Sequence, residues 1–193
     1  MKKFFKWLFK KKESVVENKP IKKVAIIIGH GNGDSGAMGW NGMSEFNYNS
    51  FVADEIARAD TGKEIKLFHR GSTGIGGVAA KAMAWKGDIT IEMHLNAFNG
   101  KAKGCCVLTL KDQVSIDTGR AYSKAFCKKF NRVMRDEDGV VELVKGDRGH
   151  FSLACVNDPA PSILIESFFI DNKDEWIEMM DYANFLIEWI KEL

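Results

Sequence analysis

The sequence predicts a single α/β domain whose central sheet is twisted, mostly parallel and flanked by helices. Short apolar, β-branched runs alternate along the chain with longer segments of helical periodicity. That order favours parallel strands joined by right-handed crossovers. The chain has 193 residues, of which 45% are hydrophobic, and this suffices for one ordinary domain with a sizeable core.

Five short segments are predicted to be strands, most of them apolar and rich in β-branched residues. They are 24–28, 64–68, 88–94, 105–110 and 162–168. In parallel sheets of α/β proteins, the working site lies beyond the carboxyl ends of the strands. His30 follows the first of these segments and His94 closes the third. We therefore expect both histidines at the same edge of the sheet.

Helical periodicity marks four further segments: 44–59, 75–85, 115–135 and a closing helix that includes 176–190. Ser44 is a suitable N-cap for the first of them. In the third, the spacing predicts that Tyr122, Phe126 and Val133 point inward.

Residues 1–22 are predicted to be a basic amphipathic segment and linker. The globular domain is predicted to comprise residues 23–193. Six lysines lie within the first twelve residues, interleaved with aromatic side chains. Residues 1–12 either contact an anionic membrane surface or form a solvated tail. The segment lacks the apolar core of a signal peptide, and no stretch approaches the ~20 apolar residues of a membrane span.

The net charge of the whole chain is +2, which gives no broad signature of nucleic-acid binding. We expect no nucleic-acid partner, and we expect a monomer. The four cysteines do not form a Cys-x-x-Cys pair, and all four are predicted to be reduced.

Four side chains suggest hydrolytic chemistry at a metal: His30, Glu45, His94 and Glu166. Two histidines and one glutamate are a common ligand set for catalytic zinc, which keeps one position open. Glu166 interrupts an apolar strand, where a carboxylate is costly unless it is paired or near a cation. Simpler interpretations remain for single residues, since a histidine at a strand end is often structural and Glu45 suits the first turn of a helix.

Three stretches around these side chains resemble motifs of the amidase_3 family of N-acetylmuramoyl-L-alanine amidases. They are Gly29-His30-Gly31 with Asp34, Gly36-Ala37 and Gly39; Glu92-Met93-His94-Leu95-Asn96-Ala97; and Pro161 to Asn172. They are similar to the opening zinc motif, the second histidine motif and the C-terminal motif that carries the catalytic glutamate. Glu45 stands where the family has its glutamate ligand, and the resemblance runs from about Val24 to Leu193.

The resemblance implies one zinc ion held by His30, Glu45 and His94, with Glu166 as the catalytic carboxylate. It implies hydrolysis of the lactyl amide between N-acetylmuramic acid and L-alanine in peptidoglycan, which is then the substrate partner. It also implies a six-stranded sheet, so that five to six strands are expected in all.

Three other polar residues have two interpretations each. Asn96 either supports the metal site or ends the strand as a turn residue. His150 lies in the segment 146–152, predicted to be a loop beside the substrate groove, and is a candidate for substrate binding. Glu92 is on the same strand face as His94, and we expect it to be solvated.

The biological setting predicted for such a chain is a phage or prophage endolysin that lyses the host cell. The protein would be made in the bacterial cytoplasm without a signal peptide and would act on the cell wall after release by a membrane-permeabilising protein. A bacterial wall-remodelling amidase is the alternative. A non-catalytic peptidoglycan-binding module predicts loss of one of the four site residues, and all four are present. A membrane-disrupting protein that acts through residues 1–12, independently of zinc, predicts that deletion of these residues abolishes lysis while Glu166→Ala does not.

Overall fold

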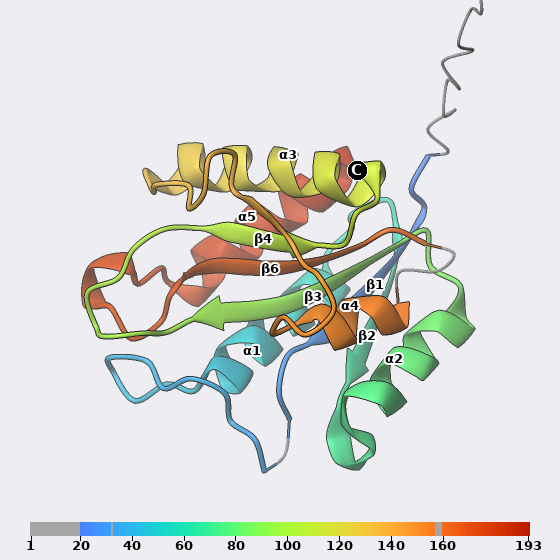
Figure 1. Cartoon of the computed structure of the whole chain (residues 1–193), viewed down its shortest axis with the longest axis horizontal. Helices are drawn as coiled ribbons and strands as arrows, with labels where there is room; N and C mark the ends of the chain where they lie inside the picture. The colour runs from blue at the N-terminus through green and yellow to red at the C-terminus, as the bar shows by residue number, and fades with distance from the viewer. Residues whose placement is uncertain (1–19, 32, 157–159) are drawn as a thin grey trace, which may run out of the picture.

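The computed structural model describes residues 20–31, 33–156 and 160–193. These residues form one six-stranded sheet with helices on both faces (Figure 1). The predicted fold class is confirmed. Residues 1–19 lie outside the described residues, so the predictions for residues 1–12 stay untested. Within the described part of the chain, no helix has both the length and the apolar character needed to cross a membrane.

The sheet has the strand order β2-β1-β3-β6-β4-β5. The strands are β1 (Lys23–Ile28), β2 (Glu64–His69), β3 (Ile89–Asn96), β4 (Cys106–Thr109), β5 (Val140–Glu142) and β6 (Ser162–Phe169). β1, β2, β3 and β6 run parallel, whereas β4 is antiparallel to β6 and β5 is parallel to β4. The five predicted strands are present, and β5 is an additional short strand at the edge.

Five α-helices and two short 3-10 helices accompany the strands in the described residues. They are α1 (Glu45–Arg58), η1 (Gly71–Thr73), α2 (Gly74–Trp85), α3 (Gln113–Phe130), α4 (His150–Val156), η2 (Lys173–Glu175) and α5 (Met179–Glu192). The prediction for 115–135 was wrong at its end. α3 stops at Phe130 because Asn131 adopts a left-handed conformation, and Val133 beyond it is 62% exposed rather than inward. The predicted loop at 146–152 was also wrong in part, since α4 begins at His150.

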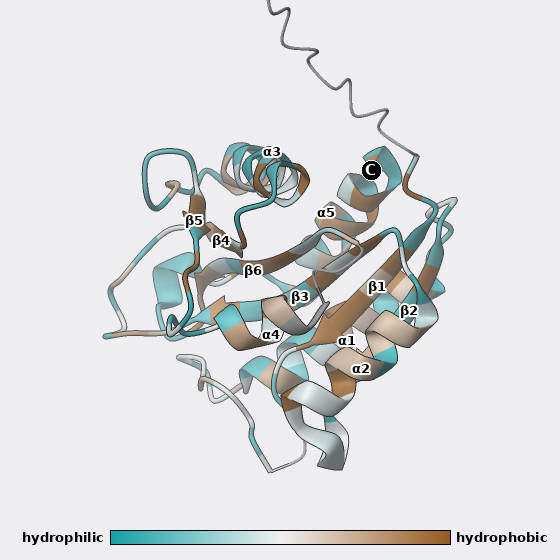
Figure 2. Cartoon of the chain, turned by 45° about the vertical axis from the view of Figure 1, so that its right-hand side comes forward, coloured by the Kyte–Doolittle hydropathy of each residue, from teal (hydrophilic) through white to brown (hydrophobic). Residues whose placement is uncertain are grey.

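The two faces of the sheet are covered by different helices (Figure 2). Val24, Ile26 and Ile28 of β1 face a large core shared with α1, α3 and α5. Ala25 and Ile27 face the other side and pack against α2. β1 is therefore buried on both faces, as its continuous apolar run predicts.

The position of the site follows from the strand order. β1 lies between β2 and β3, so the chain leaves β1 towards one side and returns on the other. This reversal opens a crevice beyond the carboxyl ends of β1 and β3, where α/β sheets bind ligands. His30 follows β1 directly and His94 lies near the end of β3, so both belong to this crevice.

Candidate metal centre and substrate cavity

His30 is placed by an unusual backbone at the end of β1. The residue has a φ of 66°, a left-handed conformation that non-glycine residues rarely adopt. Gly29 before it donates its N–H to the carbonyl of Met93 at 3.0 Å, which ties the turn to β3. A Cβ atom on Gly29 would lie only 2.6 Å from that carbonyl oxygen and would collide with the His94 ring. The Gly-His pair therefore lets the two histidine-bearing strands approach closely.

Gly36, in the loop between β1 and α1, is a second glycine that the site requires. Gly36 has a φ of 67°, and a Cβ atom there would lie 2.5 Å from the His30 ring and 2.7 Å from the Glu45 carboxylate. The absence of a side chain at this position leaves room for His30 and Glu45 to meet.

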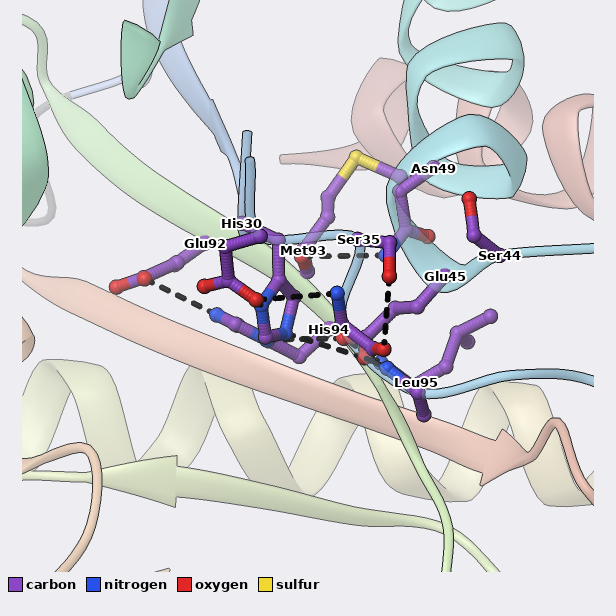
Figure 3. A network of polar contacts seen from close by, with 12 residues as sticks. His30, Ser35, Ser44, Glu45, Asn49, Glu92, Met93, His94 and Leu95 are labelled. Carbon is purple, nitrogen blue, oxygen red and sulfur yellow. Dashed lines mark hydrogen bonds and ion pairs between the residues drawn. The ribbon is translucent and has the colours of Figure 1, made fainter. Parts of the chain in front are cut away.

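Glu45 connects the two histidines (Figure 3). It is the first residue of α1, whose N-cap Ser44 accepts a hydrogen bond from the N–H of Asn47 at 3.2 Å. The buried carboxylate has His30 Nε2 at 3.1 Å from Oε2 and His94 Nδ1 at 3.0 Å from Oε1. Backbone N–H groups of residues 37 and 95 also donate to these oxygens, at 3.0 and 2.9 Å.

These contacts strongly favour negative charge on Glu45 and positive charge around it. Burial opposes ionisation of Glu45, but the hydrogen bonds from His30 and His94 outweigh it and hold its pKa far below the usual range. Burial lowers the pKa of His94, yet the hydrogen bonds to Glu45 and Glu92 raise it to about 10. The pKa of His30 is also raised, chiefly by its hydrogen bond to Glu45.

His30, Glu45 and His94 fit a bound cation. Each offers one ligand atom, and these atoms all lie within 4.8 Å of one another. Two imidazole nitrogens and one carboxylate oxygen match the donor set of catalytic zinc. The structure thus brings together the three side chains that the sequence suggests as ligands.

The second nitrogen of each histidine faces another carboxylate. His30 Nδ1 lies 3.0 Å from Asp34 Oδ1, and His94 Nε2 lies 3.1 Å from Glu92 Oε1. Arg70 lies between these acids, 3.3 Å from Asp34 and 3.9 Å from Glu92. Histidines that bind metals commonly hydrogen-bond a carboxylate through the other ring nitrogen, which fixes the tautomer and the ring orientation.

The prediction that Glu92 is solvated was wrong. Its side chain is 2% exposed and accepts a short hydrogen bond from the hydroxyl of Ser152 on α4. Burial opposes ionisation of Glu92, but the hydrogen bond to His94 lowers its pKa below the usual value. The spacing of two residues from His94 was visible in the sequence, whereas the contacts with Ser152 and Arg70 come from distant segments.

Glu166 lies beside the metal-ligand group, on β6 directly opposite His94 of β3. Its Oε2 atom is buried and has no hydrogen-bond partner among the described residues. Burial raises the pKa of Glu166 to about 7, against the lowering effect of the charge on His94. A carboxyl group that titrates near neutrality can both accept and donate a proton at physiological pH.

A cavity of about 390 Å³ joins these groups to solvent. His30, His94 and Glu166 line it, together with Asn96, whose amide nitrogen lies 4.0 Å from the sulfur of Cys106. His150 is not among the described residues that line the cavity, and its role in substrate binding stays a prediction. The segment 146–152 borders the cavity as predicted, through Arg148, Gly149 and Ser152. Sequence reasoning missed Arg70 and Arg135, which also line it.

A nitrogen–oxygen ligand group beside a carboxyl group of raised pKa is the arrangement of a metal-dependent hydrolase. The family model of N-acetylmuramoyl-L-alanine amidase matches residues 24–188 of the chain. The chain therefore belongs to this amidase family, amidase_3, and it is an enzyme of this class.

Solved structures of similar fold span almost the whole domain. One is the catalytic domain of an endolysin targeting Clostridia difficile, with 23% identity, a TM-score of 0.67, and coverage of 90% of this chain and 98% of that one. Another is the N-acetylmuramoyl-L-alanine amidase from Clostridium difficile 630, with 20% identity, a TM-score of 0.67, and coverage of 90% and 95%. A third is the catalytic domain of CwlV from Bacillus (Paenibacillus) polymyxa, with 19% identity, a TM-score of 0.66, and coverage of 88% and 94%. No curated protein matches the chain significantly.

Proposed function

We propose that the chain is a zinc-dependent amidase that hydrolyses the lactyl amide between N-acetylmuramic acid and L-alanine of peptidoglycan. His30, Glu45 and His94 hold the zinc ion, and Glu166 is the catalytic carboxylate. One observation carries the proposal: the three ligand atoms lie within 4.8 Å of one another, in the crevice where Glu166 also stands. Family membership supports the same chemistry.

Zinc, when bound, polarises the scissile carbonyl and lowers the pKa of water towards about 7. The protein side chains supply the remaining steps. Glu166 accepts a proton from the attacking water and then returns one to the nitrogen of the leaving L-alanine. Its unpaired Oε2 and its pKa of about 7 suit both transfers. Asp34 and Glu92 orient the two imidazoles, and Asn96 supports the cavity wall.

Metal removal and replacement of the ligands test the zinc centre. His30→Ala and His94→Ala should each abolish stoichiometric zinc binding and peptide release, because two ligands do not complete the set. His69→Ala is the matched control, since His69 is exposed at the end of β2. Zinc content by mass spectrometry and peptide release after chelation and zinc addition are the readouts. Full activity of the chelated enzyme would contradict zinc dependence.

For the biological setting we propose a phage or prophage endolysin that acts as a monomer. The likeness to the catalytic domain of an endolysin supports this setting, whereas the bacterial amidases among the similar structures support wall remodelling as the alternative. Cells that express the chain should grow until a membrane-permeabilising protein is added and should then lyse. Lysis should require Glu166. Slow wall turnover without lysis after permeabilisation would favour the alternative.

Residues 1–12 are proposed to contact an anionic membrane surface through their lysines. Deletion of these residues should weaken co-sedimentation with phosphatidylglycerol vesicles and leave peptide release from isolated peptidoglycan unchanged. If the deletion abolishes lysis while Glu166→Ala does not, the membrane-disrupting function replaces the amidase as the cause of lysis.

A further inference from the structure

Two arginines stand in the cavity wall near Glu166, and the proposed chemistry leaves them without a role. Arg135 comes from the segment that follows α3, and Arg148 from the segment that precedes α4. Both line the same cavity as Glu166 and the two histidines. Segments about a dozen residues apart in sequence thus contribute two arginines to the lining of one cavity.

Arg135 is held in place by backbone and side-chain contacts. Its N–H donates to the carbonyl of Cys105 at 2.8 Å, which fastens the segment to the start of β4. Its guanidinium group lies over the ring of Phe169 at 5.4 Å and donates to the sulfur of Cys106 at 3.5 Å. An arginine oriented in this way has donors left for a ligand.

Arg148 is positioned by the glycine that follows it. Gly149 has a φ of 91°, and a Cβ atom there would lie 3.3 to 3.5 Å from Leu108, Leu143 and Leu164. The turn therefore packs against the apolar cluster of Leu143, Leu153 and Leu164, and Leu164 also lines the cavity. The turn is therefore a structured part of the wall.

Both arginines are solvent-exposed, so a ligand can reach their guanidinium groups. In the described part of the chain, no carboxylate forms an ion pair with Arg135 or Arg148, whereas Arg70 in the same cavity pairs with Asp34. Both arginines act on Glu166 electrostatically and lower its pKa, but neither bonds its free Oε2. The cavity lining near Glu166 therefore offers two positive charges to an anionic ligand.

We propose that Arg135 and Arg148 form a subsite for a carboxylate of the peptide stem, on the leaving-group side of the scissile amide. The proposal rests on the proposed function. Because Glu166 donates a proton to the nitrogen of the leaving L-alanine, the peptide stem begins beside Glu166. A peptide stem carries free carboxylates at its C-terminus and on any acidic residue. Guanidinium groups bind carboxylates through paired, charge-assisted hydrogen bonds.

The test compares two forms of one peptidoglycan preparation. In one form the stem carboxylates are free, and in the other they are converted to amides with ammonia and a carbodiimide. At low substrate concentration, wild-type enzyme should release peptides about tenfold more slowly from the amidated form, since charged hydrogen bonds contribute at about this level. The double variant Arg135→Gln/Arg148→Gln should cleave both forms at the same reduced rate.

Controls separate the possible causes of a low rate. Arg58 is an exposed arginine on α1. Arg58→Gln removes one positive charge outside the cavity, as Arg148→Gln does inside it, and should keep the tenfold preference. Arg148 makes no side-chain hydrogen bond or ion pair with the other described residues. Arg148→Gln alone therefore serves if loss of Arg135 harms folding, which zinc content and thermal melting would show. Equal wild-type rates on both forms, or a double variant that keeps the preference, would overturn the subsite. No peptide release from the free-acid form would instead overturn the proposed function.

Discussion

The catalytic role proposed for Glu166 comes with an energetic cost. A carboxyl group buried beside the metal-ligand group resists ionisation, and its pKa of about 7 lies above the ordinary value of 4.5. The same burial gives it the proton affinity that general acid–base catalysis requires. A residue that serves function in this way is expected to weaken the fold at the pH where it is charged.

Glu166→Gln should therefore separate activity from stability. Peptide release should fall by a factor of about 10² to 10⁴, the usual contribution of a general acid–base group. Because the folded pKa of Glu166 exceeds its unfolded value, its stabilising effect is present below pH 4.5 and is lost as pH rises through 7. Glutamine cannot ionise, so the chelated variant should be more stable than chelated wild type at pH 8, by up to about 3 kcal/mol.

Denaturant unfolding of both chelated proteins at pH 4.5 and pH 8 measures this difference. The two stabilities should converge at the lower pH. A variant that is no more stable than wild type at pH 8 would contradict the raised pKa of Glu166.

Glu92→Gln tests whether the buried acid positions His94. The change keeps the size of the side chain but replaces the carboxylate that faces Nε2 at 3.1 Å. Zinc affinity should fall about 10- to 100-fold, the usual effect of losing such a partner. Competition with a chromogenic chelator measures it, and Glu142→Gln, on the exposed edge strand, is the control for charge. Unchanged affinity in Glu92→Gln would make the residue structural only.

At the scale of elements, the glycine loop between β1 and α1 decides whether the ligands can meet. Gly36→Ala places a methyl group against both His30 and Glu45, while Gly33→Ala, also at positive φ, meets nothing within 4 Å. Both variants should be destabilised by about 1–2 kcal/mol, because alanine is unfavourable in a left-handed conformation. Only Gly36→Ala should also lose zinc affinity, by the same chelator competition. Equal zinc affinity in the two variants would show that the loop shape does not govern the site.

The elements themselves were largely predictable, and the exceptions have local causes. Runs such as Val24–Ile28 predict buried strands because they are short, β-branched and apolar without alternation, as strands covered on both faces are. β5 has three residues and α4 has seven, too few to show a period. The end of α3 was misplaced because Asn131, rather than glycine, provides the left-handed C-cap.

At the scale of the whole molecule, the site was predictable only where sequence motifs marked it. His30, Glu45, His94 and Glu166 lie in segments with recognisable motifs or at strand ends. The contacts around them join distant segments, as Glu92 does with Ser152 across 60 positions. Pairings of this kind depend on how α4 packs over the sheet, and the local sequence carries no signal for them.

Zinc binding should also stabilise the whole domain, because the ligands come from three separate elements that unfold together. A ligand at 100 times its Kd adds about 2.7 kcal/mol. For a domain of this size, that corresponds to a rise in Tm of about 5–10 °C. Thermal scans with chelator, and after zinc is restored, measure the shift. An identical Tm in both conditions would indicate that the ligand group does not bind zinc tightly.

The most direct test of the central claim is the identity of the reaction products. Purified peptidoglycan is digested with wild-type enzyme, with chelated and zinc-restored enzyme, and with Glu166→Ala, and the products are analysed by mass spectrometry. We predict free stem peptides that begin with L-alanine, absent after chelation, restored by zinc and absent in the variant. Cleavage within the stem peptide or in the glycan strand, or intact peptidoglycan in every sample, would contradict the account.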